Sequence, residues 1–208
     1  MSDSVTGLLE AWLQRQVPDP QYAWLQGALA ALRDGRLRDL EVVFGLAPRR
    51  LGRADLKVTA EDLARAAAVR PGWDPRGWTL GDAARILALL RFSQAAADFA
   101  PTVTELCRTA DVGEAVALYR GLPLYPGPEA FDWQVGEGLR TSMQAVFEAI
   151  AHRSPYPMEN FSEERWNHMV LKALFIGSAL APIQGLDRRA NPTLARILSD
   201  YAHERRAA

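Results

Sequence analysis

Residues 79–92 read Thr-Leu-Gly-Asp-Ala-Ala-Arg-Ile-Leu-Ala-Leu-Leu-Arg-Phe, and they carry a clear structural signal. Thr79 can cap a helix, and the carboxylate of Asp82, three residues later, can return a hydrogen bond to the Thr79 backbone N–H. The residues that follow are mostly Ala and Leu, which are strong helix formers, with further apolar side chains at Ile86 and Phe92. The pattern predicts an α-helix that begins directly after Thr79.

The same helical character extends over the whole chain of 208 residues. It contains 34 Ala and 27 Leu, compared with 25 residues of Val, Ile and Thr together, so helix formers outnumber β-branched residues. Two more capping pairs, Thr59 with Asp62 and Asp111 with Glu114, mark two further helix starts. With 49% apolar and 24% charged residues, the chain can bury one sizeable core. We therefore expect an all-α protein.

Successive helices are expected to pack as antiparallel hairpins. Apolar residues follow a helical spacing at 8–13, after Ser4, and again at 24–32, after Pro20, which predicts a first pair of helices. No fixed period repeats along the sequence, so we expect an irregular α/α stack, similar in layout to helical-repeat proteins. The stack is expected to form a single domain over residues 1–208.

Proline and glycine mark the places where we expect the helices to stop. A basic link is predicted at 47–53, and a rigid turn with two Trp side chains, which caps a hairpin, at 70–78. Pro101 is predicted to divide residues 93–109 into two pieces. Three prolines between 122–128 predict a connector inside the domain.

The sequence lacks the marks of several function classes. Its 24 basic and 25 acidic residues leave a net charge of −1, so no basic excess indicates binding to nucleic acid or to an anionic membrane. The nucleotide, zinc and hydrolase signatures GxxxxGK, GxGxxG, HExxH and GxSxG do not occur. We therefore expect no cofactor and no resident metal.

The expected location follows from hydropathy and from cysteine use. No stretch reaches the roughly 18 apolar residues of a membrane span, and the first residues lack the pattern of an export signal. We therefore expect a cytoplasmic protein that does not span a membrane. The single cysteine, Cys107, cannot form an intramolecular disulfide and is expected to be a packed apolar residue.

A long helix is predicted from Pro128 to Ile150. Apolar residues recur on one of its faces at steps of three and four, and Glu137 and Arg140 lie roughly opposite. These two residues, three positions apart, can form an ion pair on a solvated face. Alternatively, they form one wall of a polar pocket.

Lys172 is the only polar residue between Met169 and Gly177, in a helix that its apolar neighbours predict to be buried on all sides. An ammonium left buried and unpaired costs several kcal/mol, so it must reach solvent, lose its proton or meet a carboxylate. The sequence therefore predicts a partner for Lys172, and Asp187 and Asp200 are the candidates.

Asn191 and Pro192 predict the start of the last helix, as its N-cap and its first residue. On this helix Asp200 precedes His203 by three residues. The spacing suits a charge network, and it also suits metal ligation or a histidine base oriented by a carboxylate. A transition-metal site normally has several N or S ligands, and no second His lies in register, so a structural network is favoured.

Six segments of the C-terminal half match the pattern of a known family. They are 137–140 (Glu-Gly-Leu-Arg), 146–151 (Val-Phe-Glu-Ala-Ile-Ala), 154–157 (Ser-Pro-Tyr-Pro), 166–175 (Trp-Asn-His-Met-Val-Leu-Lys-Ala-Leu-Phe), 185–192 (Gly-Leu-Asp-Arg-Arg-Ala-Asn-Pro) and 200–205 (Asp-Tyr-Ala-His-Glu-Arg). Residues 47–52, 70–75 and 117–119 fit the same pattern more loosely. Together these segments strongly resemble the EboA family.

The resemblance implies a bacterial protein of the ebo gene cluster. Such proteins are associated with moving secondary metabolites or their precursors toward the cell envelope, alongside a membrane prenyltransferase-like protein. No settled reaction comes with the resemblance. His168 stands where the family usually has Gln, and the sequence ends at Ala208 where members tend to continue with a Trp and a further tail. We expect a contact supplied by that tail to be missing here.

Three functional hypotheses follow. The first is a non-catalytic metabolite-binding or adaptor protein, with a small-molecule ligand and no nucleic-acid partner. Its predicted pocket is lined by Glu137, Arg140, Trp166, Asn167, Lys172, Asp187, Arg189, Asn191, Asp200, His203 and Arg205. The second is an enzyme for a polar or isoprenoid-linked intermediate, with His203 as a base oriented by Asp200 and with Lys172 as an electrostatic or imine-forming group. The third is a buried ionic network that only fixes the order of the helices.

Overall fold

Each of the three predicted capping boxes begins a helix in the computed structural model, which describes residues 3–207. At Thr79, the side-chain oxygen accepts a hydrogen bond from the Asp82 backbone N–H at 3.1 Å, and Asp82 accepts one from the Thr79 N–H at 2.8 Å. Thr59 and Asp111 cap their helices through the same reciprocal pair of hydrogen bonds. Local sequence therefore sets these helix starts.

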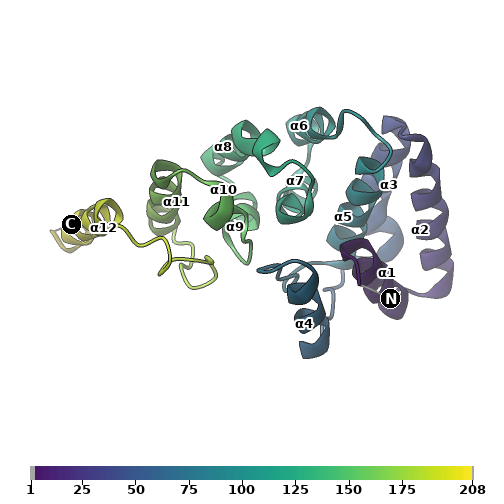
Figure 1. The fold of residues 1–208 in the computed structure, drawn as a ribbon, viewed down its shortest axis with the longest axis horizontal. Coiled ribbons are helices and arrows are strands. Elements are labelled where there is room, and N and C mark those ends of the chain that lie inside the picture. The colour runs from purple at the N-terminus through teal and green to yellow at the C-terminus, as the bar shows by residue number, and fades with distance from the viewer. Residues whose placement is uncertain (1–2, 208) are drawn as a thin grey trace.

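Residues 3–207 form twelve α-helices, three short 3-10 helices and no strand, which confirms the all-α prediction. The α-helices are α1 (Val5–Gln16), α2 (Asp19–Ala31), α3 (Leu37–Leu51), α4 (Ala60–Val69), α5 (Leu80–Ser93), α6 (Phe99–Thr109), α7 (Val112–Arg120), α8 (Asp132–Arg140), α9 (Gln144–Ala151), α10 (Tyr156–Asn160), α11 (Glu163–Phe175) and α12 (Pro192–Ala207). The 3-10 helices are η1 (Leu32–Asp34), η2 (Leu122–Leu124) and η3 (Pro128–Phe131). Figure 1 shows them as an irregular, elongated stack from α1–α3 at one end to α12 at the other.

Helix α5 is the centre of the N-terminal half. It packs against α1, α3 and α7, and every residue from Leu80 to Leu90 is buried. This agrees with its sequence, because a helix that is apolar around most of its circumference has no face suited to water. The remaining helices extend the stack through α9 and α11 to α12, which packs against α11 (Figure 1). None of the helices in residues 3–207 is long and apolar enough to cross a membrane.

The predicted link at 47–53 is instead the end of α3, which continues through Pro48 to Leu51. A proline inside a helix leaves the carbonyl four residues earlier without its usual N–H donor. That carbonyl belongs to Phe44, and it accepts a hydrogen bond from Arg85 Nε at 2.7 Å. The prediction was wrong because a side chain from α5 supplies the missing donor.

Two further predictions about where helices are interrupted were wrong. Pro101 does not divide a helix but lies in the first turn of α6, where backbone N–H groups have no helical partner. The long helix predicted from Pro128 to Ile150 is broken at residues 141–143, between α8 and α9. Thr141 there has an extended backbone, and its side-chain oxygen accepts a hydrogen bond from Met143 N at 3.2 Å.

The predicted rigid turn at 70–78 is present, and it joins distant parts of the chain. Trp73 and Trp78 are buried, and the Trp73 ring lies between Trp12 of α1 and Trp78, at centroid distances of 5.4 and 6.1 Å. Gly72 has a φ of +81°, and a Cβ there would lie 2.8 Å from Pro155 Cβ. We call residues 70–78 the tryptophan loop. It packs between α1 and the segment after α9. The turn therefore makes long-range contacts in addition to the hairpin cap that was predicted.

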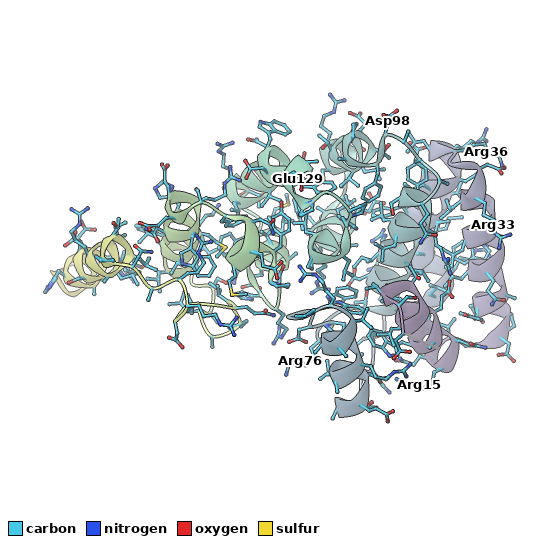
Figure 2. The ribbon with its side chains drawn as sticks, in the orientation of Figure 1. Arg15, Arg33, Arg36, Arg76, Asp98 and Glu129 are labelled. Carbon is cyan, nitrogen blue, oxygen red and sulfur yellow. The ribbon has the colours of Figure 1, made fainter. Side chains whose placement is uncertain are left out.

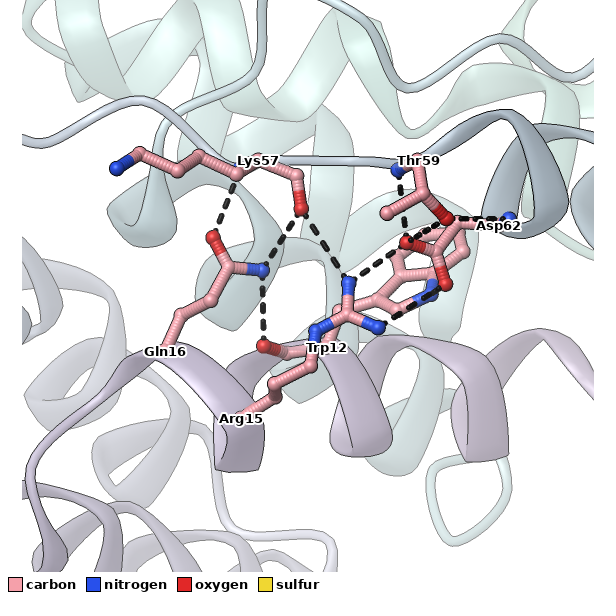
Figure 3. A network of polar contacts seen from close by, with 6 residues as sticks. All are labelled: Trp12, Arg15, Gln16, Lys57, Thr59 and Asp62. Carbon is pink, nitrogen blue, oxygen red and sulfur yellow. Dashed lines mark hydrogen bonds and ion pairs between the residues drawn. The ribbon is translucent and has the colours of Figure 1, made fainter.

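A buried carboxylate fixes α4 against α1 (Figure 3). Asp62 is 3% exposed and accepts hydrogen bonds from Trp12 Nε1 at 2.8 Å and from Arg15 Nη2 at 2.6 Å. It also closes the capping box with Thr59. The Arg15 guanidinium, more than any other neighbour, holds the pKa of Asp62 well below its usual value.

Candidate functional site

Lys172 has partners, but they are backbone carbonyls and not a carboxylate. Its Nζ donates hydrogen bonds to the carbonyl oxygens of Leu139 and, at 2.8 Å, Thr141, and it lies 5.7 Å from the centre of the Phe147 ring. Burial lowers the pKa of Lys172, whereas the two carbonyl dipoles stabilise its protonated form. The predicted pairing with Asp187 or Asp200 is absent from the described ion pairs and hydrogen bonds.

The carbonyl partners exist because α8 ends at Arg140. The last carbonyls of a helix lack N–H donors within it, and here two of them meet the ammonium of a neighbouring helix. Helix α11 is not buried on all sides as predicted. Met169, Val170 and Ala173 are buried, whereas Phe175 is 64% exposed. Lys172 lies between these faces and is part-buried.

A cleft of about 560 Å³ lies between α8 and α11, and we call it the α8–α11 cleft. Its lining residues are Gly136, Leu139 and Arg140 from α8, together with Ser162, Glu164, Arg165, His168, Met169 and Lys172 from α11 and its N-cap. The two helices are close here, since a Cβ at Gly136 would lie 3.6 Å from Arg165 Nη2, an ordinary van der Waals distance. The structure therefore brings the predicted residues Arg140 and Lys172 to one cleft.

Positive charge dominates the α8–α11 cleft. Arg140, Arg165 and Lys172 line it, and Glu164 is the one carboxylate in the lining. Arg140 pairs with Glu137 three residues earlier, and Arg165 pairs with Asp132, so each guanidinium is held by a carboxylate outside the lining. Guanidinium groups fixed in this way keep further N–H donors for a ligand. The arrangement suits an anionic group.

Four other predicted site residues serve as a joint between α11 and α12. Asn167 and Asn191 exchange reciprocal side-chain amide hydrogen bonds of 3.2 and 2.9 Å, and Asn191 caps α12 through the Leu194 N–H at 2.8 Å, as predicted. Arg189 lies 4.9 Å from the centre of the fully buried Trp166 ring. It donates to three backbone carbonyls, those of Pro157, Met158 and Phe161. The two asparagines therefore use both polar side-chain atoms within the protein, whereas Arg189 donates through Nη1 alone and Trp166 Nε1 has no hydrogen-bond partner among the described residues.

The remaining predicted residues lie outside the cleft. Asp187, Asp200, His203 and Arg205 are exposed, and the described part of the chain gives their side chains no hydrogen bond or ion pair. His203 does not line the α8–α11 cleft, to which Lys172 contributes. An enzyme with His203 as the base and Lys172 as the amine needs both side chains in one cavity, and the cleft that Lys172 lines does not include His203. Among residues 3–207, no group of three His, Cys, Asp or Glu side chains could hold a metal ion.

Sequence reasoning missed several residues of the cleft, although their spacing could have revealed them. Arg165, His168, Met169 and Lys172 follow one another at steps of three, one and three, so they share one face of α11. Its polar members Arg165 and His168 lie just before the apolar run that begins at Met169, and that run alone does not indicate a polar face. The partner face on α8 could not be inferred, because α8 was predicted to be part of a longer helix.

Comparisons with known proteins agree with the resemblance drawn from the sequence. Residues 5–208 match the family model described as metabolite traffic protein EboA. No curated protein and no solved structure matched the chain. Because the match extends over nearly all of the sequence, the chain belongs to the EboA family of metabolite traffic proteins.

Proposed function

We propose that this protein is a non-catalytic metabolite-binding or adaptor protein, and that the α8–α11 cleft holds the metabolite. Its role on this proposal is to help move a secondary metabolite or its precursor toward the cell envelope. The family description supports the traffic role. The cleft volume of about 560 Å³ lies within the roughly 300–1,000 Å³ typical of small-molecule sites, which supports the assignment of the site.

The observation that carries the proposal is the way Lys172 is held. Two carbonyls orient its ammonium, but neither brings a full negative charge, and none of the described carboxylates forms an ion pair with it, although Glu164 lies in the same lining. A bound carboxylate or phosphate would supply that charge, with Arg140 and Arg165 donating from either side. The metabolite is therefore proposed to be anionic.

The context of the protein follows from the same proposal. We place it in the cytoplasm, with a membrane prenyltransferase-like protein of the same gene cluster as a partner. The exposed side chains of Asp200, His203 and Arg205 on α12 are available for that contact. In this arrangement the cleft carries the ligand, while α12, at the end of the stack, meets the partner (Figure 1).

Native mass spectrometry of the protein purified from its own cells tests the ligand assignment. We expect a small anion bound to the wild type, and its loss, by at least about tenfold, in Arg140→Gln and Lys172→Met. Arg36→Gln is the matched control, because Arg36 also pairs with a carboxylate three residues away, Asp39, but at the N-terminal end of the molecule (Figure 2). Wild-type occupancy in both cleft variants would contradict the proposal.

A further inference from the structure

A second cavity lies beneath the tryptophan loop, and it shares no lining residue with the α8–α11 cleft. It has a volume of about 150 Å³ and is walled by the loop, by α7 and by α9 with the residues that follow it. An adjoining hollow of about 380 Å³ shares Arg76 and Arg153 with it. Arg76 lies on the side of the molecule where α4 projects (Figure 2).

A buried donor without a partner belongs to the wall of this cavity. The Trp73 side chain is 3% exposed, and its Nε1 has no hydrogen-bond partner among the described residues. Trp12, in the same aromatic cluster, donates to Asp62 at 2.8 Å. Leaving a buried N–H unsatisfied costs about 1–3 kcal/mol, so such a group calls for an acceptor. Trp73 itself lines the cavity.

Two arginines of the same wall are held rigidly by carboxylates. Arg76 donates Nε and Nη2 to Asp74, with the shortest distance 2.6 Å, and Arg120 donates Nη1 to Asp82 at 2.6 Å. Arg76 Nη1 and Arg120 Nη2 are left without a hydrogen-bond partner in the described part of the chain. Guanidinium groups oriented in advance lose little further entropy when they bind an anion.

Arg153 supplies a third guanidinium, and its backbone is strained. Its φ is +50°, the one positive value outside glycine in residues 3–207, and its N–H donates to the Pro182 carbonyl at 2.9 Å. Its Nη1 lies 3.9 Å from where a Cβ of Gly77 would be, so the side chain reaches the tryptophan loop. No described carboxylate pairs with it. Arg153 lines both hollows, so its guanidinium gives them a positive charge that is not paired with a described carboxylate.

The only carboxylate in the lining, Glu148, is itself occupied. It accepts hydrogen bonds of 2.8 Å from Ser178 Oγ and from Gln144 Nε2. These bonds lower the pKa of Glu148 against the opposing effect of burial, so the group is ionised and used by the protein. The lining still offers a ligand the free donors of the three arginines, together with the polar groups of His152 and Ser154.

We propose that this cavity is a second ligand site, which binds the oxyanion group, a carboxylate or a phosphate, of a small molecule. The space is about five times the roughly 30 Å³ that a water takes in the liquid, which is enough for such a group alone. The rest of the molecule extends past Arg153 into the adjoining hollow. Arg153 and Trp73 are the binding residues, while Arg76 and Arg120 complete the set of donors.

The indole N–H signal of Trp73 in a proton–nitrogen NMR spectrum tests this site directly. Trp73→Phe identifies that signal, and the labelled full-length protein is titrated with sodium phosphate and, separately, with sodium acetate at constant ionic strength. We expect a saturable shift of the Trp73 signal with at least one anion. The anion that saturates at the lower concentration identifies the group as phosphate or carboxylate.

Variants make the outcome decisive. Arg153→Asn keeps a residue that tolerates positive φ and removes the guanidinium, so we expect about tenfold weaker binding with an unchanged Tm. Arg140→Gln, in the α8–α11 cleft, should bind as the wild type does, which separates this site from the proposed function. Shifts that stay linear to about 100 mM, equal shifts of all tryptophan signals, or wild-type affinity in Arg153→Asn would overturn the proposal.

Discussion

Single polar residues compensate for irregular backbone at several points in this protein. Arg85 is 5% exposed, yet it is stable there because the Phe44 carbonyl, left free by Pro48, needs a donor and Glu114 lies 3.5 Å from Arg85 Nη2. Lys172 does the same for the carbonyls at the end of α8. In both cases a cationic side chain donates to backbone carbonyls that lack a helical partner.

A double-mutant cycle tests the compensation at Pro48. Arg85→Met should lower the free energy of unfolding by about 2–3 kcal/mol, since it leaves the Phe44 carbonyl unsatisfied. In the Pro48→Ala background the same change should cost at least about 1 kcal/mol less, because Ala restores the helical N–H. Urea unfolding of the four proteins measures this coupling. Additive effects would mean that Arg85 acts only through packing and Glu114.

Asp62 predicts how stability depends on acid. Its folded-state pKa lies below the unfolded value, so its contribution is present above the unfolded value of 3.8 and is lost as pH falls through the folded value. Asp62→Asn should reduce the free energy of unfolding by about 2–3 kcal/mol at pH 7, and the loss should shrink steadily below about pH 4. Exposed Asp187→Asn serves as the control. A loss that does not vary with pH would contradict this account.

At the scale of elements, the helix starts could be predicted and some helix ends could not. Capping boxes involve residues three positions apart, so Thr59, Thr79 and Asp111 carried enough information by themselves. The carbonyls left free by the break after Arg140 are satisfied by Lys172, about thirty residues later, and the carbonyl left free by Pro48 in α3 is satisfied by Arg85. The spacing of apolar residues within α3 or α8 carries no information about Arg85 or Lys172, because both lie on other helices. For the same reason, the cleft was predicted only through Arg140 and Lys172.

The junction of α8 and α11 predicts a specific stability loss. Lys172→Met should lower the free energy of unfolding by about 1–3 kcal/mol, because two carbonyls lose their donor while the side-chain volume is kept. Lys57→Met changes the only other lysine, which is exposed, and should stay within about 0.5 kcal/mol of the wild type. Chemical denaturation compares the two. Equal effects would show that the carbonyl contacts do not stabilise the junction.

At the scale of the whole molecule, the tryptophan loop links α1 to the segments that follow α9 and α11. It contacts α1 through the Trp12 ring and the segment after α9 through Pro155, and Gln184 Nε2 donates to the Gly72 carbonyl at 2.8 Å. A turn was predictable from its prolines and glycines. Its contacts were not, since their partners lie 61, 83 and 112 positions away in the sequence.

Gly72 of this loop and Gly177, which lies after α11, allow backbone strain to be measured separately from close packing. Gly72 and Gly177 both have positive φ, +81° and +71°, but only Gly72 has a neighbour, Pro155 Cβ, within 3 Å of a built Cβ. Gly177→Ala should therefore cost about 1 kcal/mol, from the backbone alone, and Gly72→Ala at least about 1 kcal/mol more. Thermal unfolding of both variants measures the difference. Equal losses would mean that the loop is not held tightly against Pro155.

The central claim is that the α8–α11 cleft holds an anionic metabolite, and a crystal structure of the protein isolated with its natural small molecule tests it most directly. The account predicts difference density between α8 and α11, with the negative group within hydrogen-bonding distance of Lys172 Nζ and of the Arg140 or Arg165 guanidinium. Density for the molecule only at another place, with the cleft filled by solvent, would contradict it.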